Sequence, residues 1–593
     1  MVPSITRRAF AWAVFLGLVG AARWLDGRTL PTSAESGAAP AAGTAVAFRL
    51  REVARERGIT FAHRPFRVDP RIAHVEPHVA GVGAAVSCTD FDGDGWIDFY
   101  ATSSEFGSHN ALYRNLGPAS PGRFVEVAAE VGLADVNSKD GVSMGSVWAD
   151  ADQDGDEDCF LYKYGRPQLF RNEGGRFVDV TKESGLDRWI NSNSAVWLDY
   201  DRDGLVDLYV TGYFRDDVVL WDLASTSIMQ ESFQFARNGG HNRMFKNLGG
   251  LAFRDVTEEL GVDSTRWTLA VASADFDRDG WPDLYLANDY GPEELFLNRE
   301  GRRFEAAPGL LDGRSKSGMS VAVGDVENKG DLGVYVTNIT NARFLQQGNN
   351  LRLRDAQGGE FVNVARDEVS NCGWAWGAAF GDLDRDGRQD LYVVNGFVSA
   401  SRERDYWYDL AKIAGAEKGV FQDALHWPAF GDKSLSGYER SRVLVWSKGR
   451  LRDCAAGIGA DDVLDGRAVA LADFENRGVL DVVIANQCQP LLLYRNEPAA
   501  ERRWIQFRLV GTRSNTSAIG ATVVVGFALG EQLQVVGGGS GMSSQGDRRL
   551  FFGLGDDAAP RFARITWPSG EVVTLDRPQV DRLHVVREGE GAR

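Results

Sequence analysis

Short apolar segments separated by polar turns run along most of this 593-residue chain. DFYATS at 98–103, DLYVTGYF at 207–214 and DLYLAND at 283–289 alternate as half-buried strands do. Between them a second pattern recurs, such as LFRN at 169–172 followed by a glycine turn, RFVDV and a short helical segment. The two patterns together predict a repeated unit of four strands that ends in a helical turn, and hence an all-β protein.

A nine-residue acidic loop precedes these strands. Five intact copies, beginning at residues 90, 150, 199, 275 and 382, have Asp at positions 1, 3, 5 and 9 and Gly at position 6. Two degenerate copies begin at Asp325 and Asp473 and carry Lys329 and Arg477 at position 5. A loop repeated in register seven times indicates one architecture built from seven copies of the unit.

The spacing of the carboxylates predicts a calcium site in each intact loop. Ca²⁺ prefers six to eight oxygen ligands, and a glycine at position 6 permits the sharp turn that wraps them around one ion. The predicted ligands are the Asp residues at positions 1, 3, 5 and 9 and the backbone carbonyl at position 7. These are Asp90, Asp92, Asp94, Trp96 and Asp98; Asp150, Asp152, Asp154, Asp156 and Asp158; Asp199, Asp201, Asp203, Leu205 and Asp207; Asp275, Asp277, Asp279, Trp281 and Asp283; and Asp382, Asp384, Asp386, Arg388 and Asp390.

The number of ions expected is about five Ca²⁺ per chain. The alternative is a set of acidic surface turns with no ion, in which four clustered carboxylates would repel one another. In the two degenerate loops the fixed charge of Lys329 or Arg477 would replace the ion. We therefore expect those two loops to bind no calcium.

The ends of the repeat array predict that it closes. LREVARERGI at 50–59 resembles the last part of a repeat unit but stands before the first loop, whereas LLLYRNE at 491–497 lacks the strand that should follow it. An N-terminal strand that completed the last unit would remove the exposed edges of an open array. We therefore predict a seven-bladed β-propeller over residues 47–500, with an open solenoid as the alternative. Insertions at 214–241 and 397–437 show helical spacing, and Trp407, Tyr408 and Trp427 could form a binding platform or pack onto the sheets.

The N-terminal segment indicates export. Residues 1–30 combine a basic start with a 14-residue uncharged stretch at 9–22, which suits a signal peptide and leaves an uncleaved membrane anchor as the alternative. Residues 31–46 are rich in Ala, Gly, Ser and Pro and are predicted to be a linker. The net charge of −18 argues against nucleic acid as a partner.

The remaining part of the chain, 504–590, is predicted to be a small all-β domain. Its segments SNTSAIGATVVV, GSGMSSQGDRRLFFGLG and ITWPSGEVVTL resemble the ASPIC/UnbV module of the cartilage acidic protein 1 family. The DxDxDGxxD loops resemble the FG-GAP/VCBS repeats of integrin α-subunit propellers. These resemblances imply a calcium-binding protein that is secreted, periplasmic or surface-associated.

The function predicted is a binding or adhesion module for an extracytoplasmic protein or glycan. The alternative is an extracytoplasmic enzyme, for example one directed at polysaccharides, that uses the propeller as its frame. G-x-S-x-G at 141–145 leads into an acidic loop and not into the helix that a nucleophile elbow requires. His63, His74 and His78 match no standard zinc spacing. No catalytic residue is therefore assigned.

Overall fold

The computed structural model describes residues 47–341, 345–355, 359–416, 418–539, 541–557 and 559–592, so the predicted signal or anchor segment and its linker lie outside the described residues. Strands dominate, which confirms the predicted all-β class. Among the described residues, no helix has both the length and the apolar character needed to cross a bilayer.

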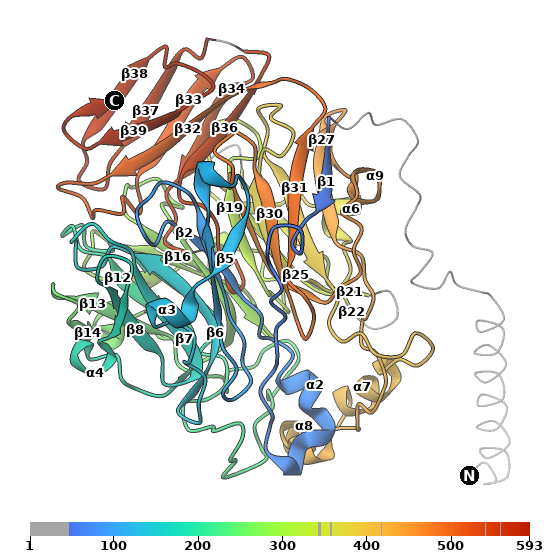
Figure 1. The fold of residues 1–593 in the computed structure, drawn as a ribbon. Helices are drawn as coiled ribbons and strands as arrows, with labels where there is room; N and C mark the ends of the chain where they lie inside the picture. Colours follow the sequence, from blue (N-terminus) through green and yellow to red (C-terminus); the bar gives the residue numbers. More distant parts are fainter. Residues whose placement is uncertain are drawn as a thin grey trace, which may run out of the picture. The chain divides into compact units, whose positions relative to one another are not determined.

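Seven sheets, each with four main antiparallel strands, form the larger part of the fold, and these strands are consecutive in the chain except in the fifth and the last sheet (Figure 1). The first three sheets are β2 (Val86–Thr89), β3 (Asp98–Ala101), β4 (Ala111–Asn115) and β5 (Phe124–Glu126); β6 (Gly141–Ala149), β7 (Asp158–Gly165), β8 (Gln168–Asn172) and β9 (Phe177–Asp179); and β11 (Ala195–Leu198), β12 (Asp207–Val210), β13 (Arg243–Asn247) and β14 (Phe253–Asp255). A short strand, β10 (Ile190–Asn191), also pairs with β7.

The other four sheets repeat this order. They are β15 (Trp267–Ala274), β16 (Asp283–Asp289), β17 (Glu294–Asn298) and β18 (Phe304–Ala306); β19 (Val321–Gly324), β20 (Gly333–Val336), β23 (Asn350–Arg354) and β24 (Phe361–Asn363); β25 (Ala375–Gly381), β26 (Asp390–Asn395), β27 (Arg442–Ser447) and β28 (Arg450–Asp453); and β29 (Gly466–Ala472), β30 (Asp481–Asn486), β31 (Leu492–Pro498) and β1 (Phe48–Glu52). A separate pair is formed by β21 (Thr340–Asn341) and β22 (Leu345–Gln346).

The first strand of each sheet is buried on both faces, because it packs between the first strands of the neighbouring sheets. All nine residues of β6 are buried. Contacts run from β2 to β6, β11, β15, β19, β25 and β29 in turn, and β29 also contacts β2. The acidic loop of each sheet joins its first and second strands, so all seven loops hold the same place in the unit.

The N-terminal strand completes the last sheet, as the sequence predicts. β1 pairs antiparallel with β31 in the register Phe48↔Pro498 to Glu52↔Tyr494. Phe48 and Leu50 are buried by this pairing. The turn after β1 continues toward the first sheet, where Gly58 has a φ of 94° and lies against the carbonyl of Phe124. A Cβ at Gly58 would come within 2.6 Å of that oxygen, so only glycine fits there.

Single-turn helices follow the outer strands of most sheets, as the repeated helical segment predicts. They are α3 (Ala128–Val131), α4 (Thr181–Ser184), α5 (Thr257–Leu260), α6 (Asp367–Ser370) and α9 (Ala455–Ile458). The 3-10 turn η3 (Pro308–Leu310) takes the same place after β18, and η2 (Gly117–Ala119) lies between β4 and β5. Before the first sheet the chain forms η1 (Pro70–Val75) and α2 (Glu76–Val79).

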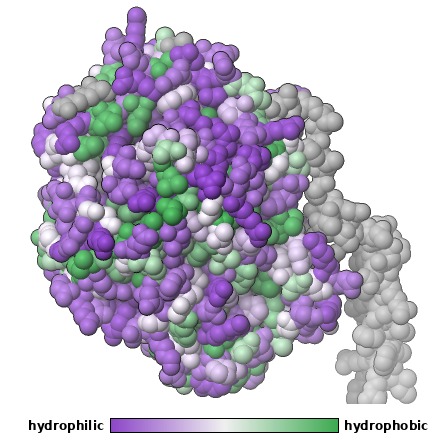
Figure 2. All heavy atoms as spheres, in the orientation of Figure 1, coloured by the Kyte–Doolittle hydropathy of each residue, from purple (hydrophilic) through white to green (hydrophobic). Residues whose placement is uncertain are grey.

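The first of the two insertions differs from its prediction. Residues 214–241, described throughout, form no helix, and their apolar side chains, such as Leu220 and Met229, are buried in the main core from an irregular segment. Residues 397–437 do contain α7 (Trp407–Ala414), α8 (Lys418–Gln422) and η4 (Ala424–His426). Trp407 and Trp427 are buried, as the packing alternative predicts, and Tyr408 is 73% exposed, so the three side chains do not form one exposed platform. Figure 2 shows a mostly hydrophilic face on which hydrophobic residues form separate patches.

Residues after 502 form two further four-stranded sheets. They are β36 (Leu550–Gly555), β32 (Arg503–Val510), β39 (Leu583–Arg587) and β40 (Gly591–Ala592); and β34 (Gly530–Val535), β33 (Thr522–Phe527), β37 (Phe562–Thr566) and β38 (Val572–Asp576). Between β34 and β36 the chain reaches the seven sheets, where β35 (Ser544–Gln545) pairs in parallel with β2. We refer to residues 503–592 as the C-terminal region, and its separation from the repeats as a domain stays a prediction.

Candidate metal centres

The seven loops share one backbone turn. In every loop the carboxylate at position 1 accepts a hydrogen bond from the N–H of the glycine at position 6, over distances of 2.6 to 3.2 Å. These glycines have positive φ, for example 92° at Gly280. In the intact loops the N–H at position 7 donates to the carboxylate at position 5, as Trp96 does to Asp94 at 2.8 Å. The role of the position-7 carbonyls as ligands stays a prediction.

Carboxylate oxygens converge in each of the five intact loops. In three loops the residues at positions 1, 3 and 5 each place one oxygen within 4.8 Å of the others, and in two loops positions 1, 3 and 9 do so. The groups are Asp90, Asp92 and Asp94; Asp199, Asp201 and Asp203; Asp275, Asp277 and Asp279; Asp150, Asp152 and Asp158; and Asp382, Asp384 and Asp390. Among the described residues, these five are the groups of three or more His, Cys, Asp or Glu close enough to share an ion.

The aspartate at position 9 has a second task that the sequence did not indicate. In the fourth loop, Asp283 accepts the N–H of Phe276 at 2.8 Å through one oxygen and the N–H of Asn298 at 2.8 Å through the other. The first, second and third loops repeat both bonds. This carboxylate therefore fixes the loop to the third strand of its own sheet, and in the second and sixth loops it also joins the converging group of oxygens.

Burial and mutual repulsion raise the pKa of these carboxyls. Desolvation is the main cause, and the neighbouring aspartates add to it, so that the pKa of Asp158 and of Asp283 rises to about 8. The pKa of Asp199 rises to about 7 and that of Asp275 to about 6 for the same reasons. A cation among the oxygens would remove both causes, since it supplies the opposite charge at short range.

The donor set suits a hard divalent cation. Four buried carboxylate oxygens in the intact loops accept no hydrogen bond: Oδ1 of Asp152, Asp199, Asp201 and Asp275. In the third loop the second oxygen of Asp201 is held by Lys246, and in the fourth the second oxygen of Asp277 is held by Arg299 at 2.9 Å. Asp201 Oδ1 stays unpaired, whereas Asp277 Oδ1 accepts the N–H of Asp279 at 3.2 Å. Unpaired buried oxygens are what a calcium ion would bind.

The degenerate loops use their position-5 residues in different ways. In the seventh loop Arg477 donates to Asp481, at position 9, at 2.6 Å and lies 3.4 Å from Glu475. In the fifth loop Lys329 pairs with Glu327 at 2.8 Å and is largely exposed, and position 9 is Gly333. Each cation thus pairs with a loop carboxylate. The absence of calcium from these two loops stays a prediction.

A ladder of asparagines joins neighbouring loops. The last residue of a third strand donates through Nδ2 to the position-2 carbonyl of the preceding loop, as Asn298 does to Tyr200 at 2.9 Å. The same bond runs from Asn115 to Phe474, Asn172 to Phe91, Asn247 to Ala151 and Asn496 to Leu383, at 2.7 to 2.8 Å. Arg354 makes the corresponding bond to Phe276. The recurring RN and KN pairs of the sequence were the available signal for this role.

Two family models match parts of the chain. FG-GAP-like repeats match residues 90–161, 150–210, 216–286, 275–336 and 342–393, and a match described as ASPIC and UnbV covers 511–593. Human cartilage acidic protein 1 is 22% identical over 82% of this chain and 69% of its own length, and the mouse protein is 22% identical over 84% and 72%. The chain is a homologue of cartilage acidic protein 1. The predicted family is thereby confirmed.

The Xenopus tropicalis cartilage acidic protein 1 gives the same picture, with 22% identity over 82% of this chain and 71% of its own. Among solved structures, Saccharomyces cerevisiae Sqt1 aligns with 69% of this chain and 83% of its own at 8% identity, with a TM-score of 0.36 that is too low to support an argument. The repeat matches include each intact loop, and the seventh loop, at 473, lies outside them.

The other candidate residues of this homologue are structural. Ser143 of the G-x-S-x-G sequence lies inside β6, where it is buried and its hydroxyl accepts from Asn110 at 3.1 Å. His63 is buried between the Ser104 hydroxyl at 3.2 Å and the N–H of Cys488 at 3.3 Å, and burial lowers its pKa to about 3. His78 packs against Trp427, with ring centroids 5.0 Å apart. None of the three histidines belongs to a group of three potential metal ligands within the described residues.

Proposed function

We propose that the seven sheets are the blades of a seven-bladed β-propeller. Three observations support this: the contacts between successive first strands return from β29 to β2, β1 completes the seventh sheet, and Asn115 of the first sheet bonds to Phe474 of the seventh loop at 2.8 Å. A closed arrangement removes the lateral faces that an open solenoid leaves at its two ends.

We further propose that the five intact loops bind about five Ca²⁺ ions. The observation that carries this proposal is the convergence of three carboxylate oxygens within 4.8 Å in each of these loops, with unpaired buried oxygens among them. Asp residues at positions 1, 3, 5 and 9 would supply side-chain oxygens, and the residue at position 7 would supply its carbonyl. The ions would neutralise the repelling carboxylates and so stabilise the blades.

The biological role we propose is that of an exported binding or adhesion module for an extracytoplasmic protein or glycan. The homology to cartilage acidic protein 1, whose name places it in cartilage, supports work outside the cell. The basic and apolar N-terminal sequence supports export. The potential metal ligands lie in repeated loops and so support a scaffolding role for the ions.

Metal analysis of the purified full chain tests the calcium proposal. We expect about five Ca²⁺ per chain by inductively coupled plasma mass spectrometry after dialysis against metal-free buffer. A count near zero or near seven would show that the loops have been misinterpreted.

A binding screen tests the proposed role. The exported region would be applied to arrays of glycans and of extracellular proteins, with calcium and with EGTA. Binding to a defined ligand that EGTA weakens would support a calcium-stabilised adhesion module. Hydrolysis or cleavage of an arrayed polysaccharide would instead support the enzyme alternative.

A further inference from the structure

The C-terminal region lies on the acidic loops. It contacts the first loop through Arg508 and Asp90, 3.5 Å apart, and the second through the Ser517 hydroxyl, which accepts the N–H of Asp150 at 2.9 Å. In the sixth loop the carbonyl of Arg385 accepts the N–H of Gly555 at 2.9 Å. Arg548 also pairs with Glu157 of the second loop. The two degenerate loops receive bonds from the C-terminal region as well.

The fifth loop joins β34 through a short ladder of backbone bonds. Gly330 donates to the carbonyl of Glu531 at 3.0 Å, and the N–H of Glu531 donates to the carbonyl of Asn328 at 3.2 Å. The buried Gln532 side chain donates to Asn328 Oδ1 at 2.9 Å. This pairing fixes residues 328–330 to the edge of the sheet that β34 begins.

The position-1 carboxylate of the fifth loop also bonds to the C-terminal region. Asp325 Oδ2 accepts the N–H of Leu533 at 3.0 Å in addition to the N–H of Gly330 at 2.8 Å. In the intact second and fourth loops, the carboxylates of Asp150 and Asp275 accept N–H groups of their own loops. In the fifth loop, therefore, a backbone N–H of the C-terminal region takes up charge that an ion would take up elsewhere.

The seventh loop is held by arginines. Arg549 of the C-terminal region donates to the carbonyl of Asp473 at 3.0 Å and to Asn476 Oδ1 at 2.5 Å. Within the loop, Arg477 pairs with Asp481 at 2.6 Å. Gly478 lies so close to the indole of Trp504 that a Cβ there would come within 1.9 Å of it.

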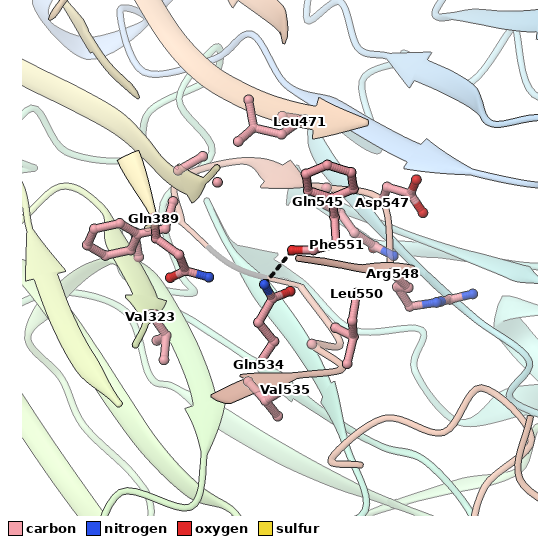
Figure 3. A pocket seen from close by; sticks show the side chains of 18 of the residues that line it. Val323, Gln389, Leu471, Gln534, Val535, Gln545, Asp547, Arg548, Leu550 and Phe551 are labelled. Atoms are coloured by element: carbon pink, nitrogen blue, oxygen red, sulfur yellow. Dashed lines mark hydrogen bonds between the residues drawn. The ribbon is translucent and has the colours of Figure 1, made fainter. Parts of the chain in front are cut away.

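The contact is not uniform across the remaining surface. A cavity of about 190 Å³ lies between β19, β25 and β29 on one side and the residues of β34 and β36 on the other. Figure 3 shows Gln389, Gln534 and Phe551 around it, with the Gln534 amide bonded to the Phe551 carbonyl. Gln389 Oε1 has no hydrogen-bond partner there. Beside this cavity, backbone bonds also join the C-terminal region to the first strands of the sheets, as from Trp197 N–H to the Gly538 carbonyl at 2.9 Å and from Gly541 N–H to the Val321 carbonyl at 2.9 Å.

We propose that the fifth and seventh loops are docking sites for the C-terminal region that work without calcium. In the loops at 325 and 473, which lack the DxDxDG pattern, the C-terminal region then occupies the role that an ion has in the intact loops. The inference goes beyond the proposed calcium binding of the five other loops, because it predicts that the C-terminal region stays attached when those ions are removed.

Hydrogen exchange on the full chain, read by mass spectrometry with calcium and with EGTA, tests this. We expect EGTA to speed amide exchange in peptides covering the intact loops at 199–207 and 275–283 by about tenfold or more. Exchange in peptides covering 327–331 and 530–535 should change less than about twofold. Equal acceleration in all four peptides would overturn the proposal.

A pair of variants separates docking from calcium binding. Gln532→Ala removes the bond to Asn328 at 2.9 Å and the bond to the Gly387 carbonyl of the sixth loop at 3.2 Å. It should speed exchange at 327–331 and 530–535 while the calcium content stays unchanged, because the Gly387 carbonyl is not a predicted calcium ligand. Glu531→Ala is the matched control, since Glu531 contacts the loop through its backbone and its partly exposed side chain faces Arg564 at 3.8 Å. If EGTA changes no peptide, the calcium proposal fails, and these variants still test docking. If Gln532→Ala leaves exchange at 327–331 as in the control, docking through the fifth loop is refuted.

Discussion

Removal of calcium should lower the stability of the seven repeated sheets, and the distances between the loop carboxylates allow the size of the effect to be worked out. In each intact loop three carboxylate oxygens lie within 4.8 Å of one another. At an effective dielectric constant of about 20, a pair of full charges at that separation costs about 3 kcal/mol. The raised pKa of Asp158 and Asp283 shows that protonation relieves part of this cost when no cation is present.

The stabilisation of the folded state by bound calcium follows from mass action. An ion present at a hundred times its Kd stabilises the folded state by about 2.7 kcal/mol, and five independent sites at that ratio contribute about 13 kcal/mol. Differential scanning calorimetry of the full chain in EGTA should therefore show a Tm lower by about 10 °C or more than in calcium. Excess calcium should restore the original Tm.

Two variants make this prediction specific to the intact loops. Asp277→Ala, in the fourth loop, should lower the Tm in calcium and reduce the calcium count by about one. Glu327→Ala, in the fifth loop, removes a partly exposed carboxylate paired with Lys329 and should leave the count unchanged. An identical melting curve with and without EGTA, or a lower count in Glu327→Ala, would refute the structural role assigned to calcium.

Three further predictions concern closure, the asparagine ladder and pH. Leu50→Ala should lower the free energy of unfolding in urea by about 3 kcal/mol, because β1 buries this side chain in the seventh sheet; a loss below about 0.5 kcal/mol would contradict that pairing. Asn298→Ala should cost about 2–4 kcal/mol, because it leaves the buried carbonyls of Tyr200 and Pro282 unpaired, and an unaltered urea midpoint would count against the ladder. The pKa of Glu588 falls to about 2, because hydrogen bonds from the Ser569 hydroxyl and the N–H groups of 512–514 outweigh its burial. Its carboxylate thus contributes about 3 kcal/mol above pH 4.5, and the difference in stability between the wild type and Glu588→Gln should shrink as the pH falls toward 2; a constant difference would contradict this.

Much of the fold was predictable because the repeat unit is local. Strand alternation, as at 283–289, and the turn at the position-6 glycine depend on residues only a few positions away. One copy of the repeat is therefore enough to predict them, and the other copies repeat the pattern. The pairing of β1 with β31 was also predictable, because the surplus strand at one end matched the missing strand at the other. The irregular structure of the insertion at 214–241 was not predictable, since its apolar residues have helical spacing in the sequence but are buried without forming a helix.

The role of the two degenerate loops could not be predicted from the sequence. Lys329 and Arg477 were expected to replace the charge of an ion, and each pairs with a loop carboxylate. From the sequence alone this is a simple loss of a metal site. The contacts that indicate a docking role for these two loops come from residues about 75 to 210 positions away. Leu533 donates to Asp325, and Arg549 donates to Asp473. Such partners become visible only when the C-terminal region is placed on the loops. A repeat that departs from its consensus in this homologue is therefore best interpreted by asking what lies against it, since a neighbouring surface can satisfy the same oxygens that an ion would.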